Sequence, residues 1–132
     1  MEYKYADFTG ELINAAMEVH RILGNDFQEV IYQRAYEIEL NQKNLFTVCR
    51  EVEMPVRYKG HVIGTRRVDF LINDLISIEI KALIKLEDVH LAQALNYLEA
   101  YNLEVGLLIN FGAKSLEFKR LFNKKYNVSQ TG

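Results

Sequence analysis

A fifteen-residue stretch in the middle of the chain, residues 67–81 with the sequence RVDFLINDLISIEIK, constrains the fold more than any other segment. From position 68 to position 80, every even-numbered residue is apolar except Asp74, which lies beside Asn73 in an evident turn. Side chains alternate between the two faces of a strand, so this pattern predicts a hairpin with one apolar face. The other face carries charged and small polar residues: Arg67, Asp69, Ser77, Glu79 and Lys81.

The apolar pattern also predicts the register of this hairpin. Both apolar halves share one face only if paired residue numbers sum to an even value, which a three-residue loop at 73–75 allows. The pairs are then Ile72 with Ile76, Phe70 with Ile78, and Val68 with Ile80. The same register sets Asp69 opposite Glu79, with Cβ atoms roughly 4.5–5.5 Å apart. We therefore expect two neighbouring carboxylates, with Lys81 two residues further along the same face.

Two carboxylates at this separation repel each other, and partial burial raises their pKa values unless a cation lies between them. A hard divalent ion such as Mg²⁺ is commonly held by one or two carboxylates together with water and substrate phosphate. Lys81 could then orient a water or stabilise charge on a phosphate. The alternative is a salt-bridged polar face on which Lys81 neutralises Glu79. The spacing alone leaves both interpretations open.

A second group of candidate residues lies on the helix predicted at 86–101. His90, Gln93 and Tyr97 follow each other at helical spacing and form one stripe. The leucines of this segment occupy a different side, which we expect to face the core: Leu91, Leu95 and Leu98. The polar stripe could face the carboxylates, or Tyr97 could simply pack on the surface of the protein.

The order of predicted elements indicates an α/β fold with a mixed sheet. A long apolar strand that follows a crossover helix is typical of such layered folds. We predict the succession α-α-β-β-β-α-β-β, in which the first three strands form an antiparallel meander and Thr9 caps the first helix. With only one proline and no repeats or linker, we expect one domain over residues 1–126 and a flexible tail at 127–132. The elements span about 9–23, 27–41, 45–54, 62–72, 76–82, 86–101, 103–111 and 116–121.

The charges are unevenly distributed along the chain. Residues 1–53 carry 5 Lys+Arg and 10 Asp+Glu, a net charge of −5, whereas residues 54–132 carry 11 and 8, a net charge of +3. The overall charge of −2 does not indicate the strongly basic domain that many nucleic-acid binders have. The basic residues of the second half form either an ordinary mixed surface or a local patch that faces phosphate.

Several features bear on the location of the protein. No apolar run approaches the roughly 18 residues needed to span a bilayer. The N-terminal sequence MEYKYADFTG lacks the pattern of a secretory signal. The single Cys49 cannot form an internal disulfide, and its strand-like surroundings predict a small buried residue. We expect no membrane association and a cytoplasmic location.

Several ordered blocks, spanning roughly residues 9–122, resemble the GxxExxY protein family. The blocks are AMEVHRILG at 16–24, GNDFQEVIY at 24–32, VRYKG at 56–60, DF at 69–70, IEIKA at 78–82, QALNYL at 93–98 and GLLINFG at 106–112. Glu29 and Tyr32 match the motif that gives the family its name. Asp26 stands where the motif has glycine, so the turn into the second helix could differ.

The GxxExxY family is placed in the PD-(D/E)xK nuclease-like superfamily, and the resemblance implies its restriction-endonuclease-like core. It also implies that Asp69 and Glu79 bind Mg²⁺ or Mn²⁺ and that Lys81 assists the attacking water. Glu29 matches an acidic residue that often completes the metal site. Gln93 and Tyr97 match a QxxxY helix motif that helps to shape the site. We also expect substrate contacts from three further residues: Tyr32, His90 and Arg67.

The leading hypothesis is therefore a metal-dependent nuclease that acts on nucleic acid, with DNA favoured over RNA. A second hypothesis is a catalytically silent module on a nuclease fold that binds nucleic acid or protein, because fold alone does not assign function. A third is a subunit of a homo-oligomer or of an assembly with a protein partner. Exposed aromatic side chains could form its interface, although the same residues could belong to the core: Tyr3, Tyr5, Phe8, Phe122 and Tyr126.

Overall fold

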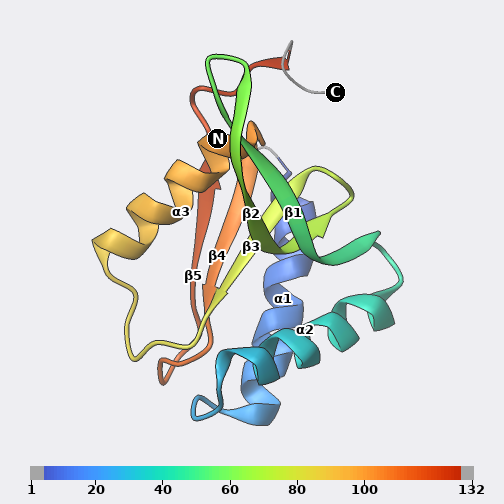
Figure 1. The fold of residues 1–132 in the computed structure, drawn as a ribbon. Coiled ribbons are helices and arrows are strands. Elements are labelled where there is room, and N and C mark those ends of the chain that lie inside the picture. Colours follow the sequence, from blue (N-terminus) through green and yellow to red (C-terminus); the bar gives the residue numbers. More distant parts are fainter. Residues whose placement is uncertain (1–4, 129–132) are drawn as a thin grey trace.

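The computed structural model describes residues 5–128, which form three helices and five strands (Figure 1). Their succession is the one predicted, and the expectation of an α/β fold with a mixed sheet is confirmed. In chain order the elements are α1 (Ala6–Leu23), α2 (Glu29–Lys43), β1 (Val48–Tyr58), β2 (His61–Ile72), β3 (Ile76–Lys81), α3 (Asp88–Tyr101), β4 (Val105–Asn110) and β5 (Glu117–Phe122).

The five strands form one sheet in the order β1-β2-β3-β4-β5. Strands β1, β2 and β3 form the antiparallel meander, and β5 pairs antiparallel with β4. Only β3 and β4 run parallel, because α3 crosses over between them. All six residues of β4 are buried, as its uninterrupted apolar sequence predicts for a strand that is covered on both faces.

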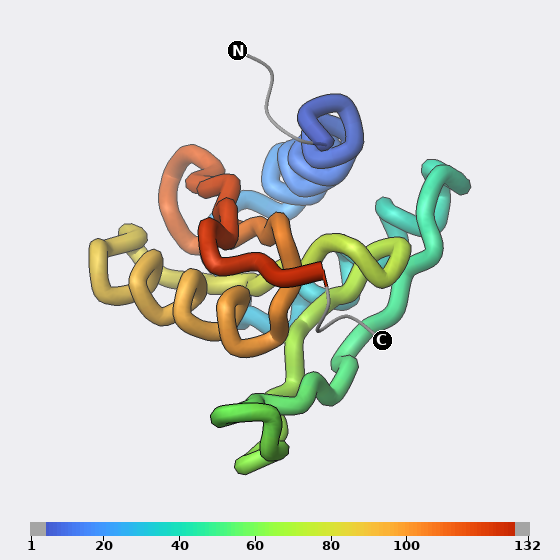
Figure 2. Tube along the Cα trace, turned by 90° about the horizontal axis from the view of Figure 1, so that it is seen from above, coloured from blue at the N-terminus to red at the C-terminus, as the bar shows by residue number. Residues whose placement is uncertain are grey.

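Helices cover both faces of the sheet, with α1 and α2 on one side and α3 on the other (Figures 1 and 2). The larger hydrophobic core joins α1 and α2 to the even-numbered side chains of the hairpin: Phe70, Ile72, Ile76, Ile78 and Ile80. A second cluster joins Leu98 on α3 to Leu108 on β4. The alternation seen in the sequence therefore selects which face of β3 meets α1 and α2, and it leaves Glu79 for the face of α3.

The predicted hairpin register is confirmed near the turn and is wrong further along. Phe70 pairs with Ile78 and Ile72 with Ile76, but the ladder ends there, and Val68 does not pair with Ile80. Val68 instead packs with Leu71 and Tyr101 on the side of α3. The alternation of β2 is thus interrupted around Asp69, opposite which Glu51 of β1 adopts a positive φ of 56°. As a result, the apolar face ends at Phe70 on this strand.

Two smaller predictions about single residues are also wrong. Helix α1 begins at Ala6, so Thr9 lies inside its first turns, where its hydroxyl donates to the carbonyls of Tyr5 and Ala6 and accepts from Arg120 Nε. Cys49 lies on β1 as expected but is exposed. The reason is that β1 is an edge strand of the sheet, so its side chains are less covered than those of β3 or β4.

The loop that follows β3 is fixed by one buried side chain. Asn110, at the end of β4, accepts a hydrogen bond from Leu83 N–H and donates to the Leu83 carbonyl and to Glu117 Oε1. Gly112 completes the contact, because a Cβ atom at this position would lie 2.5 Å from backbone atoms of Ala82 and Leu83. These contacts hold the chain immediately after Lys81.

The C-terminal tail predicted at 127–132 falls largely outside the described residues. Within them, Asn127 exchanges two hydrogen bonds with Asn102 at the end of α3. Of the aromatic residues considered for an interface, Tyr5, Phe8 and Phe122 are partly buried and pack against the core, and Tyr3 lies outside the described residues. Within residues 5–128, no helix combines the length and the hydrophobicity that a membrane crossing requires.

Candidate active site

Asp69 lies where β2 and β3 separate. The last antiparallel pair before the separation is Phe70 with Ile78. One residue further, Asp69 Oδ2 accepts a hydrogen bond of 2.7 Å from the backbone N–H of Ile80. The carboxylate therefore takes the place of a strand carbonyl, so that the ladder can open without leaving this N–H unpaired. The opening is the point at which side chains from both strands can meet.

A short chain of polar side chains holds Asp69 from the side of α2. Gln33 Nε2 donates to Asp69 Oδ1 at 3.2 Å, and Gln33 Oε1 accepts from Arg50 Nη2 at 3.3 Å. Gln33 is itself buried. Both oxygens of Asp69 are thus engaged by donors from other elements, which fixes the orientation of the carboxylate before any ligand binds.

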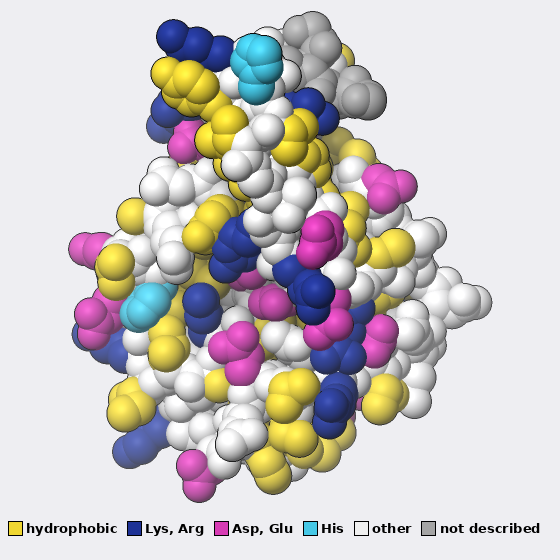
Figure 3. Space-filling view, in the orientation of Figure 1, with side chains coloured by type: hydrophobic (Ala, Val, Ile, Leu, Met, Phe, Trp, Pro, Cys, Tyr) yellow, Lys and Arg dark blue, Asp and Glu magenta, His cyan; other side chains and the backbone are white. Residues whose placement is uncertain are grey.

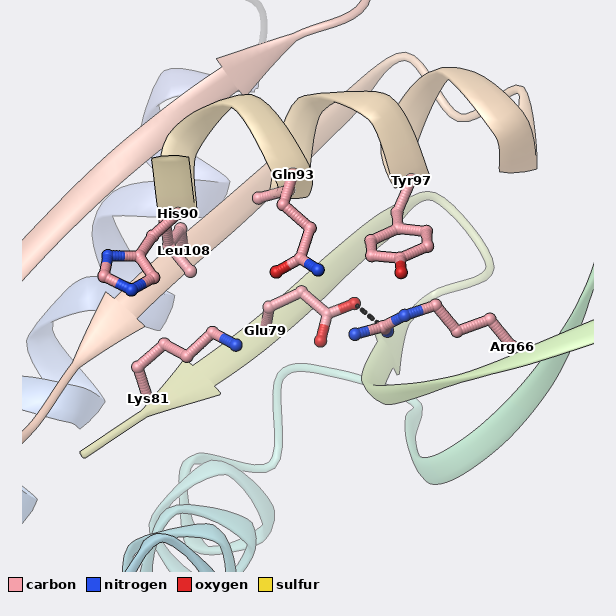
Figure 4. A pocket seen from close by; sticks show the side chains of 8 residues that line it. Arg66, Glu79, Lys81, His90, Gln93, Tyr97 and Leu108 are labelled. Carbon is pink, nitrogen blue, oxygen red and sulfur yellow. Dashed lines mark hydrogen bonds and ion pairs between the residues drawn. The ribbon is translucent and has the colours of Figure 1, made fainter. Parts of the chain in front are cut away.

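Glu79 faces a small pocket between β3 and α3, shown in Figure 4. Its side chain is buried, with 8% of the residue exposed. The pocket brings together residues from β2, β3, α3 and β4: Arg66, Glu79, Lys81, His90, Gln93, Ala94, Tyr97 and Leu108. Four predicted site residues, namely Lys81, His90, Gln93 and Tyr97, therefore gather around Glu79, and the polar stripe on α3 does face this carboxylate.

The two carboxyl groups perturb each other. Burial, followed by the negative charge of Asp69, raises the pKa of Glu79 to about 7, although the charges of Arg66 and Lys81 act in the opposite direction. Burial also raises the pKa of Asp69, and the hydrogen bond from Ile80 N–H partly offsets this effect. The two carboxyl groups therefore influence each other's charge, and a cation between them would stabilise both ionised forms.

Arg66 is the main site residue that our sequence analysis missed. Its Nη1 lies 3.1 Å from Glu79 Oε1, and its guanidinium stands 3.8 Å from the centre of the Tyr97 ring. Tyr101 OH adds a contact at 3.4 Å. The alternation described from the sequence begins at Val68 and does not include Arg66. The interruption near Asp69 turns both Val68 and Arg66 toward α3. The sequence did contain one indication of this role. Arg66 and Arg67 are neighbours in a strand, so their side chains point to opposite faces and one of them can reach α3.

Lys81 and the residues of α3 complete the pocket. The Lys81 ammonium points toward the Glu79 carboxylate, and the Gln93 amide reaches down toward it from α3 (Figure 4). His90 Nδ1 accepts a hydrogen bond of 2.9 Å from the Glu87 N–H, as part of a capping box at the start of α3. This bond fixes the orientation of the imidazole at the edge of the pocket.

Glu29 is the first residue of α2 and lies within electrostatic range of the carboxylate pair. Its pKa is raised by burial and by the charge of Asp69, and it is lowered by the charge of Lys81. Within residues 5–128, however, no three His, Cys, Asp or Glu side chains come close enough to hold one ion together. Glu29 therefore stands near the pair without joining it as a third direct ligand.

The structure does not bring Tyr32 or Arg67 into this pocket. Tyr32 is fully buried, stacks on Phe111, and donates a hydrogen bond of 2.6 Å to the Gly24 carbonyl. It therefore closes the turn between α1 and α2. The Arg67 side chain is 60% exposed, and its guanidinium lies 4.0 Å from carboxylate oxygens of Glu51 and Glu53 on β1.

Asp69 and Glu79 fit a hard divalent ion. Glu79 is buried and Asp69 is partly buried, and burial raises the pKa of both carboxyl groups, so a nearby positive charge would stabilise their ionised forms. Mg²⁺ is commonly held by one or two carboxylates, with the remaining positions filled by water and phosphate. Each carboxylate oxygen has two lone pairs, so the hydrogen bonds from Ile80, Gln33 and Arg66 leave capacity for an ion.

Comparison with known proteins agrees with this geometry. The family model described as the PD-(D/E)XK nuclease superfamily matches residues 6–121, and the chain belongs to this superfamily. The crystal structure of SSO0001 shares the fold, with a TM-score of 0.52 and 22% sequence identity over 91% of this chain. This chain spans 60% of that protein. None of the curated proteins compared with the chain matches it. The predicted superfamily and its restriction-endonuclease-like fold are thus confirmed.

Proposed function

We propose that this member of the nuclease superfamily hydrolyses phosphodiester bonds of nucleic acid in a divalent-metal-dependent reaction, with DNA as its substrate. The observation that carries the proposal is the meeting of the partly buried Asp69 carboxylate and the buried Glu79 carboxylate, beside Lys81 at the separation of β2 and β3. Members of the superfamily generally use divalent ions, and the donor set is suited to Mg²⁺ or Mn²⁺.

Asp69 and Glu79 would hold the ion, and Glu29 would act on it through water from the first turn of α2. When bound, the ion would polarise a phosphoryl oxygen and lower the pKa of a bound water. Hydrogen bonds from Ile80 and Gln33 orient the Asp69 carboxylate before the ion binds. Little conformational entropy of this side chain would therefore be lost on binding.

Lys81 and Gln93 would orient the reactants. The Lys81 ammonium lies beside Glu79, where it can hold the attacking water and stabilise charge on the phosphate. The Gln93 amide offers both a donor and an acceptor from the opposite wall of the pocket. Tyr97 would position Arg66 by stacking, and Arg66 and His90 would bind phosphate oxygens. Tyr32 would act indirectly, by shaping the turn that precedes Glu29.

The test is cleavage of labelled single-stranded and double-stranded DNA and RNA with Mg²⁺ or Mn²⁺. We expect cleavage of DNA that is lost in EDTA, in Glu79→Gln and in Lys81→Ala. Matched controls are Glu18→Gln on the exposed face of α1 and Lys114→Ala in the β4–β5 loop, which should cleave like the wild type. A folded protein that shows no metal-dependent cleavage on any of these substrates would contradict the proposal.

A second candidate function rests on the contact between Arg66 and Glu79. This ion pair already places a cation on one of the two carboxylates. In a catalytically silent nucleic-acid-binding or protein-interaction module, Arg66 would take the place of the metal. Calorimetric titration with Mg²⁺ and Mn²⁺ separates the two functions. A silent module would show no affinity for either ion, and its binding to nucleic acid would be the same in EDTA and in Lys81→Ala.

The proposal also covers the family, the domain limits, the cellular location and the association state of the protein. Membership of the GxxExxY family rests on the sequence blocks quoted above, with Asp26 as a departure. We place the described elements and the N-terminal residues in one domain, 1–126, and the protein in the cytoplasm. Association with a second copy or with a protein partner is an additional expectation that light scattering would check.

A further inference from the structure

The first hairpin of the sheet is much longer than the strand beside it. Strand β1 pairs with β2 from Val48↔Ile72 to Tyr58↔His61, whereas β3 pairs with β2 only from residue 70 to residue 72. The outer part of the hairpin, residues 54–68, therefore extends past β3 as a two-stranded ribbon, which Figures 1 and 2 show projecting from the molecule. We call residues 54–68 the β1–β2 arm.

The tip of the β1–β2 arm exposes several large hydrophobic side chains. Residues 57–65 are all exposed. They include Tyr58, Val62 and Ile63, which are 59%, 55% and 66% exposed. The base of the arm is different, because Val52 and Met54 pack against the aromatic residues of α3. A ribbon with a packed base and an open apolar tip is suited to contact a ligand with the tip.

The charge of the β1–β2 arm is opposite to that of the rest of the chain. Residues 54–68 contain four Lys and Arg residues, Arg57, Lys59, Arg66 and Arg67, and no Asp or Glu. The rest of the chain then holds 12 Lys+Arg and 18 Asp+Glu, a net charge of −6. Within residues 5–128, neither Arg57 nor Lys59 forms an ion pair with a carboxylate. Figure 3 shows the basic and hydrophobic side chains together at this end of the molecule.

The β1–β2 arm is continuous with the candidate active site. Strand β2 runs from the exposed tip through Arg66, which contacts Glu79, to Asp69, which receives the Ile80 N–H. A polyanion whose phosphate reaches Glu79 and Lys81 would therefore pass next to the arm. The ordinary mixed surface considered from the sequence accounts for the base of the arm, where Arg66 contacts Glu79 and Arg67 lies near Glu51 and Glu53. It does not account for the tip, because Arg57 and Lys59 form no ion pair with a carboxylate within residues 5–128.

We infer that the β1–β2 arm is a DNA-binding element that enters a groove of the duplex next to the cleavage point. The inference rests on the proposed function. The major groove of B-DNA, about 12 Å wide, admits a two-stranded β-ribbon. The major groove of A-form RNA is too deep and narrow for side chains to read. In this position Arg57, Lys59 and Arg67 contact backbone phosphates, while Tyr58, Val62 and Ile63 contact the floor of the groove.

The experiment measures binding without cleavage. Fluorescence anisotropy of a labelled DNA duplex is recorded in EDTA and again in Ca²⁺, over a series of salt concentrations. Lys59→Glu is compared with Lys114→Glu, which makes the same charge change in the exposed β4–β5 loop at the other end of the sheet. We expect Lys59→Glu to weaken binding about tenfold and to reduce the slope of log K against log salt by about 0.9 or more, as loss of one phosphate contact predicts.

Two further measurements decide which ligand the arm fits. Tyr58→Ala with Ile63→Ser should weaken duplex binding and leave the salt slope unchanged, because it removes no charge. Unlabelled duplex DNA should compete better than single-stranded DNA or duplex RNA. Equal weakening by Lys59→Glu and Lys114→Glu, or equal competition by the three nucleic acids, would overturn the inference. Binding lost in Lys59→Glu by a protein that never cleaves DNA would instead support the arm and contradict the proposed nuclease.

Discussion

The two carboxylates of the candidate active site lie side by side but are held in different ways. Asp69 accepts hydrogen bonds from neutral donors on both oxygens, namely the Ile80 N–H and the Gln33 amide. Glu79 is held by a cation, the Arg66 guanidinium at 3.1 Å. A neutral donor fixes the direction of a carboxylate, whereas a cation also supplies charge that a second cation can replace. Asp69 is therefore the rigid half of the site, and Glu79 is the half that would respond to a metal ion under the proposed function.

The pKa values reflect the same difference. The backbone N–H of Ile80 lowers the pKa of Asp69 and so partly offsets the effect of burial. Burial and the charge of Asp69 both raise the pKa of Glu79, to about 7. The positive charges of Arg66 and Lys81 lower it, but by less. Removal of either acidic residue should therefore have different consequences for stability, even though both belong to one motif.

The largest expected effect is on catalysis, where the two carboxylates should behave alike. Asp69→Asn and Glu79→Gln each remove a proposed metal ligand, and a loss of about 4 kcal/mol of transition-state stabilisation corresponds to a rate reduction of about 1000-fold. Single-turnover cleavage of labelled DNA with Mg²⁺ measures this reduction. Activity of either variant within about tenfold of the wild type would show that the residue is not a ligand.

Stability without metal should separate the two carboxylates. Asp69→Ala leaves the Ile80 N–H and the Gln33 amide without their acceptor, and we expect it to lower the free energy of unfolding by about 2–3 kcal/mol. Glu79→Ala leaves the partly exposed Arg66 in contact with Tyr97, Tyr101 and water, so its effect should be smaller than that of Asp69→Ala. Urea denaturation in EDTA at neutral pH measures both. Equal losses would contradict the distinction between the two halves.

The pH dependence of stability should come mainly from the Glu79 half. The ordinary pKa of a glutamate is 4.5, and that of Glu79 in the folded protein is about 7. Between these values the folded state binds more protons than the unfolded state, so the free energy of unfolding falls as the pH rises. We expect this fall in EDTA, a shallower one in Glu79→Gln, and an unchanged one in Glu18→Gln. Thermal melting at pH 4.5–7.5 measures it, and saturating Mg²⁺ should reduce the fall because it binds the ionised form.

The smallest expected effect concerns Arg66 as a competitor of the metal. Arg66→Ala removes a positive charge next to Glu79, and a change of about 1 kcal/mol in the electrostatic energy of the site corresponds to about fivefold tighter Mg²⁺ binding. Arg67→Ala removes the same charge from the neighbouring exposed position and should change the affinity less than about twofold. Calorimetry measures both constants. Weaker Mg²⁺ binding by Arg66→Ala would show that Arg66 supports the metal site.

Much of the fold could be predicted because local patterns and the core agree. The even-numbered apolar residues of the β2–β3 hairpin predicted which face of the hairpin is buried and how its strands pair near the turn. The observed pair of Phe70 with Ile78 confirms this register. The stripe of His90, Gln93 and Tyr97 selected the face of α3 that meets Glu79. Both patterns depend on the fixed periods of strand and helix, which a single sequence already contains.

The predictions were wrong where the strand departs from its regular period. The interruption at Asp69 turned Val68 and Arg66 toward α3, so Arg66 became a site residue and Arg67 remained in solvent. Tyr32 matched a sequence motif, yet it is buried beneath the turn between α1 and α2. A motif identifies a residue that matters to the fold or to the site, but it does not distinguish between the two.

The order of elements, the apolar face of the β2–β3 hairpin and the choice of Asp69, Glu79 and Lys81 as candidate site residues could all be read from local patterns in the chain. How these residues meet depends on the packing of separate elements. The opening of the β2–β3 ladder, the hydrogen bonds of Gln33 to Asp69 and the turn of Arg66 toward Glu79 all join segments far apart in the chain. Such contacts depend on which elements pack together, and the periodicity of one strand or helix carries no information about its partners.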